Sequence, residues 1–168
     1  MEARRTRDSF ETRVGVGFAC FVEQSAHGTA DFTRRRVPIE TGYEAARVEM
    51  MPDGTVLVEV GLQNHGQGHE TTLAQVAADT LGVMPEDVRV RHGDPLTTPY
   101  SVGTWASRGM ALGGGAVYLA ASEIAAKLRV IAGHLLDVDD KEINLEFRRA
   151  ELIRDRNRCL LYTSDAAD

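Results

Sequence analysis

Alternating hydrophobic and polar positions along the chain predict a series of strands. The predicted strand segments are residues 14–23, 46–50, 55–62, 88–92 and 143–147. Within them, apolar side chains recur at every second position, as in a strand with one buried face. The first segment, VGVGFACFVE, is rich in small, β-branched and aromatic residues and is expected to be buried. Pro52-Asp53-Gly54 has the composition of a turn, so segments 46–50 and 55–62 should pair as an antiparallel hairpin.

Two segments show the spacing of an amphipathic helix instead. The first begins near Glu70 and ends at Gly82, a natural stop, and the second runs from about residue 110 to 136. Gly113-Gly114-Gly115 near the start of the second helix costs about 1 kcal/mol per glycine relative to alanine, so close packing on another element or a ligand should compensate. Residues 24–42 and 93–109 are expected to be loops. The resulting order, β–ββ–α–β–α–β, predicts an α+β fold.

Composition narrows the classes of function. The 168 residues suffice for one domain, and a net charge of −6 gives no reason to expect nucleic acid or an anionic membrane as partner. Cys20 and Cys159 cannot hold an iron–sulfur cluster, which needs about four ligands. We find no signal peptide and no run of roughly 20 apolar residues, so a reduced, cytoplasmic chain without a membrane span is expected.

The last ten residues, 159–168 (CLLYTSDAAD), resemble the translation of a transposon adaptor used in sequencing libraries. We therefore take residues 1–158 as part of a domain and residues 159–168 as a non-native tail that should make few contacts and add no element. An ordinary acidic tail is the alternative.

The most informative loop is Gly66-Gln67-Gly68, between a predicted strand and a predicted helix. Free backbone amides at a helix N-terminus, with the positive end of the helix dipole, favour an anion. The Gln67 amide can both donate and accept hydrogen bonds. Taken alone the pattern is equally typical of a plain tight turn.

A second loop makes the pattern specific. Residues 66–82 (GQGHETTLAQVAADTLG) are followed by Gly93-Asp94 with Pro99 at a fixed spacing, and then by GTWASR at residues 103–108. Together these segments resemble the cofactor-binding region of molybdenum hydroxylase large subunits, the xanthine dehydrogenase, aldehyde oxidase and carbon monoxide dehydrogenase family. The resemblance extends from about residue 14 to residue 146.

The resemblance implies a molybdopterin site, in bacteria often for the cytosine dinucleotide form. Carried over by position, Gln67, flanked by Gly66 and Gly68, corresponds to the glutamine that hydrogen-bonds the molybdenum centre and pterin. Ala106 corresponds to the small residue that faces metal and substrate, and Ser107 to a hydroxyl that contacts the pterin, while Thr104 and Trp105 line the same loop. The metal is held by the pterin dithiolene, so no protein ligand is expected. Gly109 departs from the family, which usually has serine there, and this puts one cofactor hydrogen bond in question.

The implied reaction of the whole enzyme is hydroxylation of an aldehyde, a heteroaromatic ring or a similar carbon centre with oxygen from water, and carbon monoxide oxidation is a variant. Two electrons leave through molybdenum to [2Fe–2S] clusters and usually FAD on partner subunits or domains. The family's catalytic glutamate and its substrate-facing loop have no counterpart in this sequence. No residue is therefore assigned as catalytic, and the chain alone should be inactive.

Two other classes of function stay open. His65 and His69 are four residues apart and Glu70 is adjacent, and these residue types are typical of a zinc-dependent hydrolase. Gly66 and Gly68, however, disfavour a helix between the two histidines. A non-catalytic scaffold module is the other alternative, in which Arg108 and residues 113–115 serve subunit packing. A cofactor site requires the Gln67 loop and the Ala106–Ser107 loop to meet in space, and a scaffold does not.

Overall fold

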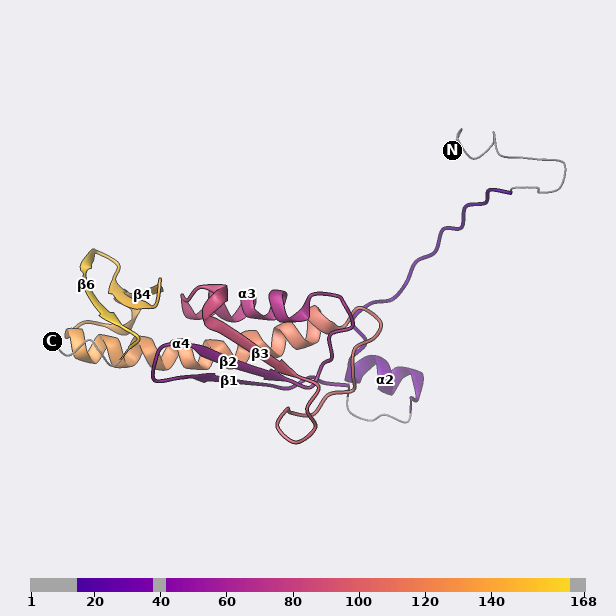
Figure 1. Ribbon diagram of the computed structural model, residues 1–168, viewed down its shortest axis with the longest axis horizontal. Coiled ribbons are helices and arrows are strands. Elements are labelled where there is room, and N and C mark those ends of the chain that lie inside the picture. The colour runs from indigo at the N-terminus through magenta and orange to yellow at the C-terminus, as the bar shows by residue number, and fades with distance from the viewer. Residues whose placement is uncertain (1–14, 38–41, 164–168) are drawn as a thin grey trace.

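The computed structural model describes residues 15–37 and 42–163. Its helices are α2 (Thr29–Arg35), α3 (His69–Leu81) and α4 (Gly115–Leu136), and its strands are β1 (Ala46–Met50), β2 (Val56–Val60), β3 (Val88–His92), β4 (Ile143–Glu146), β5 (Arg149–Leu152) and β6 (Asp155–Leu161). Short 3-10 turns precede β3 (Pro85–Asp87) and β4 (Asp140–Glu142). The described elements form two small sheets and three helices, which confirms the α+β prediction (Figure 1).

The first sheet has the order β1-β2-β3. β1 and β2 form the predicted antiparallel hairpin, with Val48 opposite Val58. β3 lies parallel to β2, and α3 makes the crossover between them. A parallel pair needs such a connection because the chain must return to the same end of the sheet.

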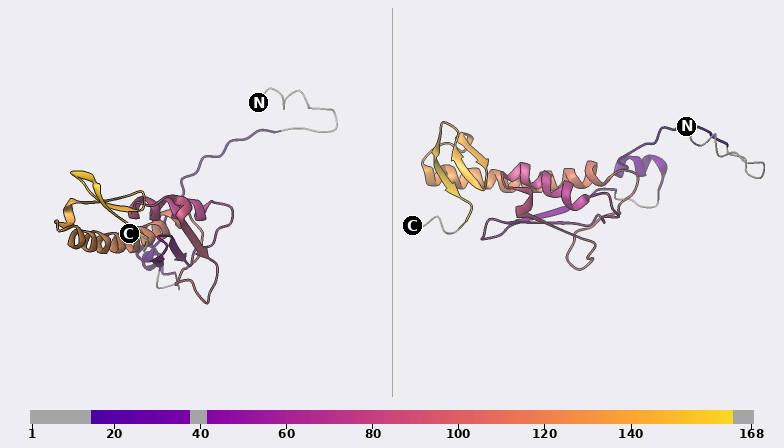
Figure 2. Two further views of the ribbon diagram at one scale, coloured as in Figure 1. Left: turned by 60° about the vertical axis from the view of Figure 1, so that its left-hand side comes forward. Right: turned by 45° about the horizontal axis from the view of Figure 1, so that its top comes forward.

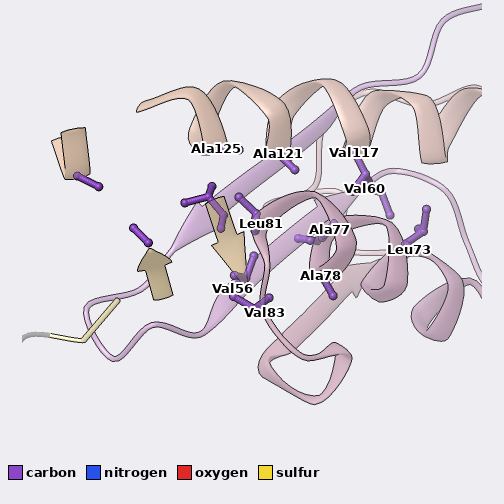
Figure 3. Packing of buried hydrophobic residues seen from close by; sticks show 14 of the residues in the cluster. Val56, Val60, Leu73, Ala77, Ala78, Leu81, Val83, Val117, Ala121 and Ala125 are labelled. Atoms are coloured by element: carbon purple, nitrogen blue, oxygen red, sulfur yellow. The ribbon is translucent and has the colours of Figure 1, made fainter. Parts of the chain in front are cut away.

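The main core lies where α3 and α4 pack on the first sheet, as Figure 3 shows. The period-two pattern of β2 places Val56, Val58 and Val60 in this core, each at most 2% exposed. Leu73, Ala77 and Leu81 of α3 meet them at helical spacing. α4 contributes small residues, Ala121 and Ala125 among them, which let its backbone approach the neighbouring elements closely.

The second predicted helix is confirmed, and its start is distorted. A π-helical turn, Gly109–Gly114, leads into α4. A Cβ added to Gly113 would lie 2.0 Å from Leu62 Cδ1, so glycine is required there by close packing on the chain that follows β2. This packing accounts for Gly113, whereas an added Cβ at Gly115 would meet nothing within 4 Å, so packing does not account for that glycine. By length and composition Gly109–Leu136 could also cross a membrane, but α4 packs on α3 and β1, and core helices meet the same criterion.

The second sheet is an antiparallel meander, β4-β5-β6, against the C-terminal part of α4 (Figures 1 and 2). The prediction that residues 159–168 add no element is wrong for residues 159–161, which complete β6 and pair with β5. Tyr162 Oη then donates to Leu81 O at 2.8 Å. These residues pair because β5 offers a free edge whose N–H and C=O groups need partners. Residues 164–168 lie outside the described residues, and the adaptor origin of the tail stays a prediction.

The N-terminal part differs most from expectation. Residues 15–23 form no strand, and Phe18 and Phe21 are 80% and 84% exposed. Composition alone does not make a strand, because its backbone needs a neighbouring strand, and none of the described strands pairs with this segment. The predicted loop over residues 24–42 contains α2, whose Phe32 is buried. Position 14 and residues 38–41 lie outside the described residues.

Candidate functional site

The two loops singled out in the sequence meet at one pocket of about 450 Å³. The residues that line it are Gln67, His69, Thr72, Thr104, Trp105, Ala106, Ser107, Arg108, Gly109 and Met110. The prediction that Gln67 and the Ala106–Ser107 pair face one cavity is therefore confirmed. Gly66 and Gly68 do not line the pocket.

The Gln67 loop is shaped by Asn64. Its Oδ1 accepts from the backbone N–H groups of Gly66 (3.1 Å) and Gly68 (3.2 Å). The sequence predicted that these amides would be free to bind a ligand, but both are already hydrogen-bonded within the loop. Both glycines have positive φ, 106° and 77°, and an added Cβ would meet nothing within 4 Å, so backbone conformation selects glycine. Gln67 Oε1 accepts from the backbone N–H of His65, which leaves the Gln67 Nε2 group to donate elsewhere.

The second loop is joined to the first by Thr104. Its hydroxyl oxygen accepts from the Gln63 backbone N–H at 2.9 Å, and the hydroxyl proton stays available. Ala106 and Ser107 both adopt the left-handed conformation, with φ of 45° and 53°. Residues other than glycine rarely do so, and the cost of about 1–2 kcal/mol each is typical of functional loops. The turn is closed by Arg108 N–H to Trp105 O, at 3.2 Å.

Arg108 holds this loop in place. Its guanidinium is fully buried and donates to His27 O (3.0 Å), Gly103 O (3.0 Å) and Gly42 O (2.7 Å). It also pairs with the Glu44 carboxylate, which is 1% exposed. Arg108 therefore ties three chain segments together, and its charge is neutralised before any ligand binds.

Trp105 is fixed by aromatic neighbours. Its ring stacks on His27 and on Phe32 of α2, with centroid distances of 5.4 and 5.5 Å. His27 in turn contacts Asp31 through Nδ1, and this hydrogen bond, together with one from Arg34, lowers the pKa of Asp31 well below its ordinary value. α2 thus positions one wall of the pocket. The sequence pattern did not predict this role of α2, although His27 and Asp31 stand four residues apart, a spacing at which side chains can interact.

The two histidines of the hydrolase alternative lie in different surroundings. His65 is exposed in the turn, whereas His69 is buried as the first residue of α3. The Glu70 carboxylate accepts from His92 and from Asn64, and the His92 hydrogen bond lowers its pKa. Within residues 15–37 and 42–163, no group of three or more His, Cys, Asp or Glu side chains is placed to hold a metal ion.

The pocket is lined by hydrogen-bond donors and apolar groups rather than by carboxylates. None of its lining residues is acidic. The hydroxyls of Thr104 and Ser107, the Gln67 amide and the buried imidazole of His69 all line it, and α3 begins at its edge. Nδ1 of His69 is buried without a hydrogen-bond partner among the described residues. Such a wall fits an oxygen-rich, anionic ligand, and the phosphate and pterin groups of molybdopterin meet this description.

Comparison with known proteins agrees with this geometry. Residues 1–163 match the family model described as the molybdopterin cofactor-binding domain. The chain is 33% identical over 157 residues to the carbon monoxide dehydrogenase large chain of Hydrogenophaga pseudoflava, covering 93% of this chain and 19% of that protein. It is 37% identical over 140 residues to the nicotine 6-hydroxylase large subunit of Paenarthrobacter nicotinovorans, covering 83% and 17%.

A solved structure of a molybdenum hydroxylase relative also matches the chain. Quinoline 2-oxidoreductase from Pseudomonas putida 86 superposes with a TM-score of 0.76 at 34% identity, over 86% of this chain and 18% of that chain. The chain thus spans less than a fifth of the length of these relatives. It belongs to the molybdopterin cofactor-binding domain of molybdenum hydroxylase large subunits, and is homologous to molybdenum-containing oxidoreductases.

Proposed function

We propose that the pocket between the Gln67 loop and the Thr104–Ser107 loop binds molybdopterin, as its cytosine dinucleotide. One observation carries the proposal: two loops far apart in sequence line a single pocket whose lining residues include no carboxylate. Gln67 Nε2 and the Ser107 hydroxyl would donate to the pterin and the metal's oxygen groups, as the family resemblance implies. The short Ala106 side chain leaves room for metal and substrate.

The full-length protein is proposed to hydroxylate a carbon centre. The balanced reaction is R–H + H₂O → R–OH + 2H⁺ + 2e⁻, and an aldehyde gives a carboxylic acid. The cofactor, when bound, supplies the redox centre that accepts the two electrons. The residues described here orient it and exclude water from one side. Iron–sulfur and FAD subunits or domains would then take the electrons, in the cytoplasm. Similarity to the nicotine and quinoline enzymes supports a heteroaromatic substrate, and similarity to carbon monoxide dehydrogenases supports carbon monoxide oxidation as the variant reaction. An aldehyde is a further candidate, and residues outside this chain set the choice.

The test is the cofactor content of the full-length protein, purified from a host that makes molybdopterin. Molybdenum is measured by elemental analysis, the pterin as its fluorescent oxidation product, and cytidine monophosphate after acid release. Gln67→Ala and Ser107→Ala should each lower the molybdopterin content. Gln75→Ala, an exposed glutamine of α3, is the matched control and should retain it.

Two results would contradict the proposal. Wild-type protein without molybdenum would exclude the site, and stoichiometric zinc in its place would favour the hydrolase alternative. Equal cofactor content in Gln67→Ala, Ser107→Ala and Gln75→Ala would place the cofactor elsewhere.

A further inference from the structure

The segment of residues 15–23 exposes apolar side chains along its whole length. Every residue in it is exposed, and the exposed fractions of Phe18, Phe21 and Val22 are 80%, 84% and 102%. Figures 1 and 2 show this segment leaving the body of the molecule as an extended chain. A contiguous run of large apolar side chains in water is unfavourable, and such a run marks a surface that another element covers.

The backbone of the segment also lacks partners. Residues 15–23 make no hydrogen bond with any other residue that the structure describes. When the apolar side chains are covered, the N–H and C=O groups between them leave water as well and need hydrogen bonds. For an extended chain, the edge of a β-sheet supplies these bonds to consecutive residues. The partner that fits this segment is therefore a sheet edge.

The two faces of the segment define how such a strand is packed. Side chains alternate between the faces of a strand, so Val16, Phe18 and Val22 would lie on one apolar face. The opposite face would carry small residues at positions 15, 17 and 19, which let another backbone approach closely. Residues 15–22 include no charged side chain. This composition suits a strand that is covered on both faces rather than one that faces water.

The described part of the chain does not pair with the segment. Ala26 N–H donates to Ala106 O at 3.0 Å, and His27 stacks on Trp105, so the chain is fixed at the pocket wall directly after the segment. From there the segment runs away from the first sheet rather than along β1 or β3, the two edge strands of that sheet (Figures 1 and 2). Its partner therefore lies outside the described residues.

We propose that residues 15–23 form a β-strand on a sheet edge supplied by the part of the large subunit outside residues 1–168. The family match over residues 1–163 includes this segment, and more than four fifths of the length of the relatives lies outside the matched region. The same polypeptide therefore provides the partner. The strand would connect that part of the subunit to Ala26 and His27, and through Trp105 to the wall of the pocket. This pairing is independent of the proposed function, because it involves no cofactor.

Hydrogen exchange with mass spectrometry on the full-length protein tests whether the strand forms. The amides of residues 16–22 should exchange at least roughly a hundredfold more slowly than in the unfolded protein. Phe18→Ala should accelerate this exchange about tenfold or more, because it removes an aromatic side chain from the covered face. Phe147→Ala is the matched control, since Phe147 is an exposed phenylalanine in the turn between β4 and β5. It should leave exchange in residues 16–22 unchanged.

Photo-cross-linking of the full-length protein identifies the partner. With Phe21→p-benzoylphenylalanine, irradiation should join position 21 to the same polypeptide outside residues 1–168. Adducts within residues 1–168, such as those to the edge strands β1 and β3, would overturn the proposal. A cross-linked dimer would assign the segment to a second copy and would overturn it too. Exchange of residues 16–22 at the unfolded rate in the wild type would show that no strand forms there.

Discussion

Replacing Arg108 with methionine should open the loop that forms one wall of the pocket. Methionine keeps much of the aliphatic volume but none of the donors. The change removes the hydrogen bonds to His27 O, Gly42 O and Gly103 O and leaves the Glu44 carboxylate buried at 1% exposure without its partner. Breaking a buried ion pair from one side costs about 3–5 kcal/mol, because the remaining charge stays desolvated.

Hydrogen exchange with mass spectrometry, carried out on the full-length protein, measures the loss of loop stability at individual backbone amides. The amide of Ala26 donates to Ala106 O at 3.0 Å and that of Arg108 to Trp105 O, so both report whether the loops stay joined. A loss of about 3 kcal/mol corresponds to exchange faster by roughly a hundredfold or more. Arg108→Met/Glu44→Met should exchange more slowly than Arg108→Met, because the unpaired carboxylate is gone.

Arg89→Met provides the matched control, because Arg89 is an exposed arginine of β3. It should leave exchange in the pocket loops unchanged. If Arg108→Met changes exchange in the pocket loops by less than about fivefold, corresponding to about 1 kcal/mol, then Arg108 does not hold these loops together. If Arg108→Met/Glu44→Met exchanges faster than Arg108→Met, the unpaired Glu44 carboxylate is not the cause of the destabilisation.

Gly113→Ala should accelerate hydrogen exchange in α4, at a cost of about 1–3 kcal/mol, because its Cβ would lie 2.0 Å from Leu62 Cδ1. Gly115→Ala, whose Cβ would meet nothing within 4 Å, should slow that exchange. Equal effects of the two substitutions would refute the packing argument. The lowered pKa of Asp31 stabilises the folded form at pH values above the ordinary carboxyl pKa, near 4, and this contribution is lost as the pH falls below that value. The difference in the free energy of unfolding between wild type and Asp31→Asn should therefore shrink from pH 6 to pH 3. A difference that grows over this range would contradict the prediction. The 168-residue chain expressed alone should aggregate and bind hydrophobic dyes, since α4 exposes several large apolar side chains, and a sharp melting transition of a monomer would disprove this.

Local pattern determined much of the scaffold. The period-two alternation of residues 46–50 and 56–60 around Pro52-Asp53-Gly54 specified a hairpin, because turn chemistry and burial on one face act over short distances. The spacing from Leu73 to Leu81 and the stop at Gly82 specified α3 for the same reason. The resemblance to the family named Gln67 and Ser107, and the structure confirmed only that they face one pocket.

Tertiary contacts decided what local pattern could not. The apolar composition of residues 14–23 predicted a strand, but a strand depends on a partner elsewhere in the chain, and residues 15–23 have none among the described strands. Residues 159–161 have a tail-like sequence and still pair with β5, because that edge was free. The ion pair of Arg108 with Glu44 joins residues that are distant in sequence. Such contacts exist only once the chain has folded, because burial sets both their cost and their geometry.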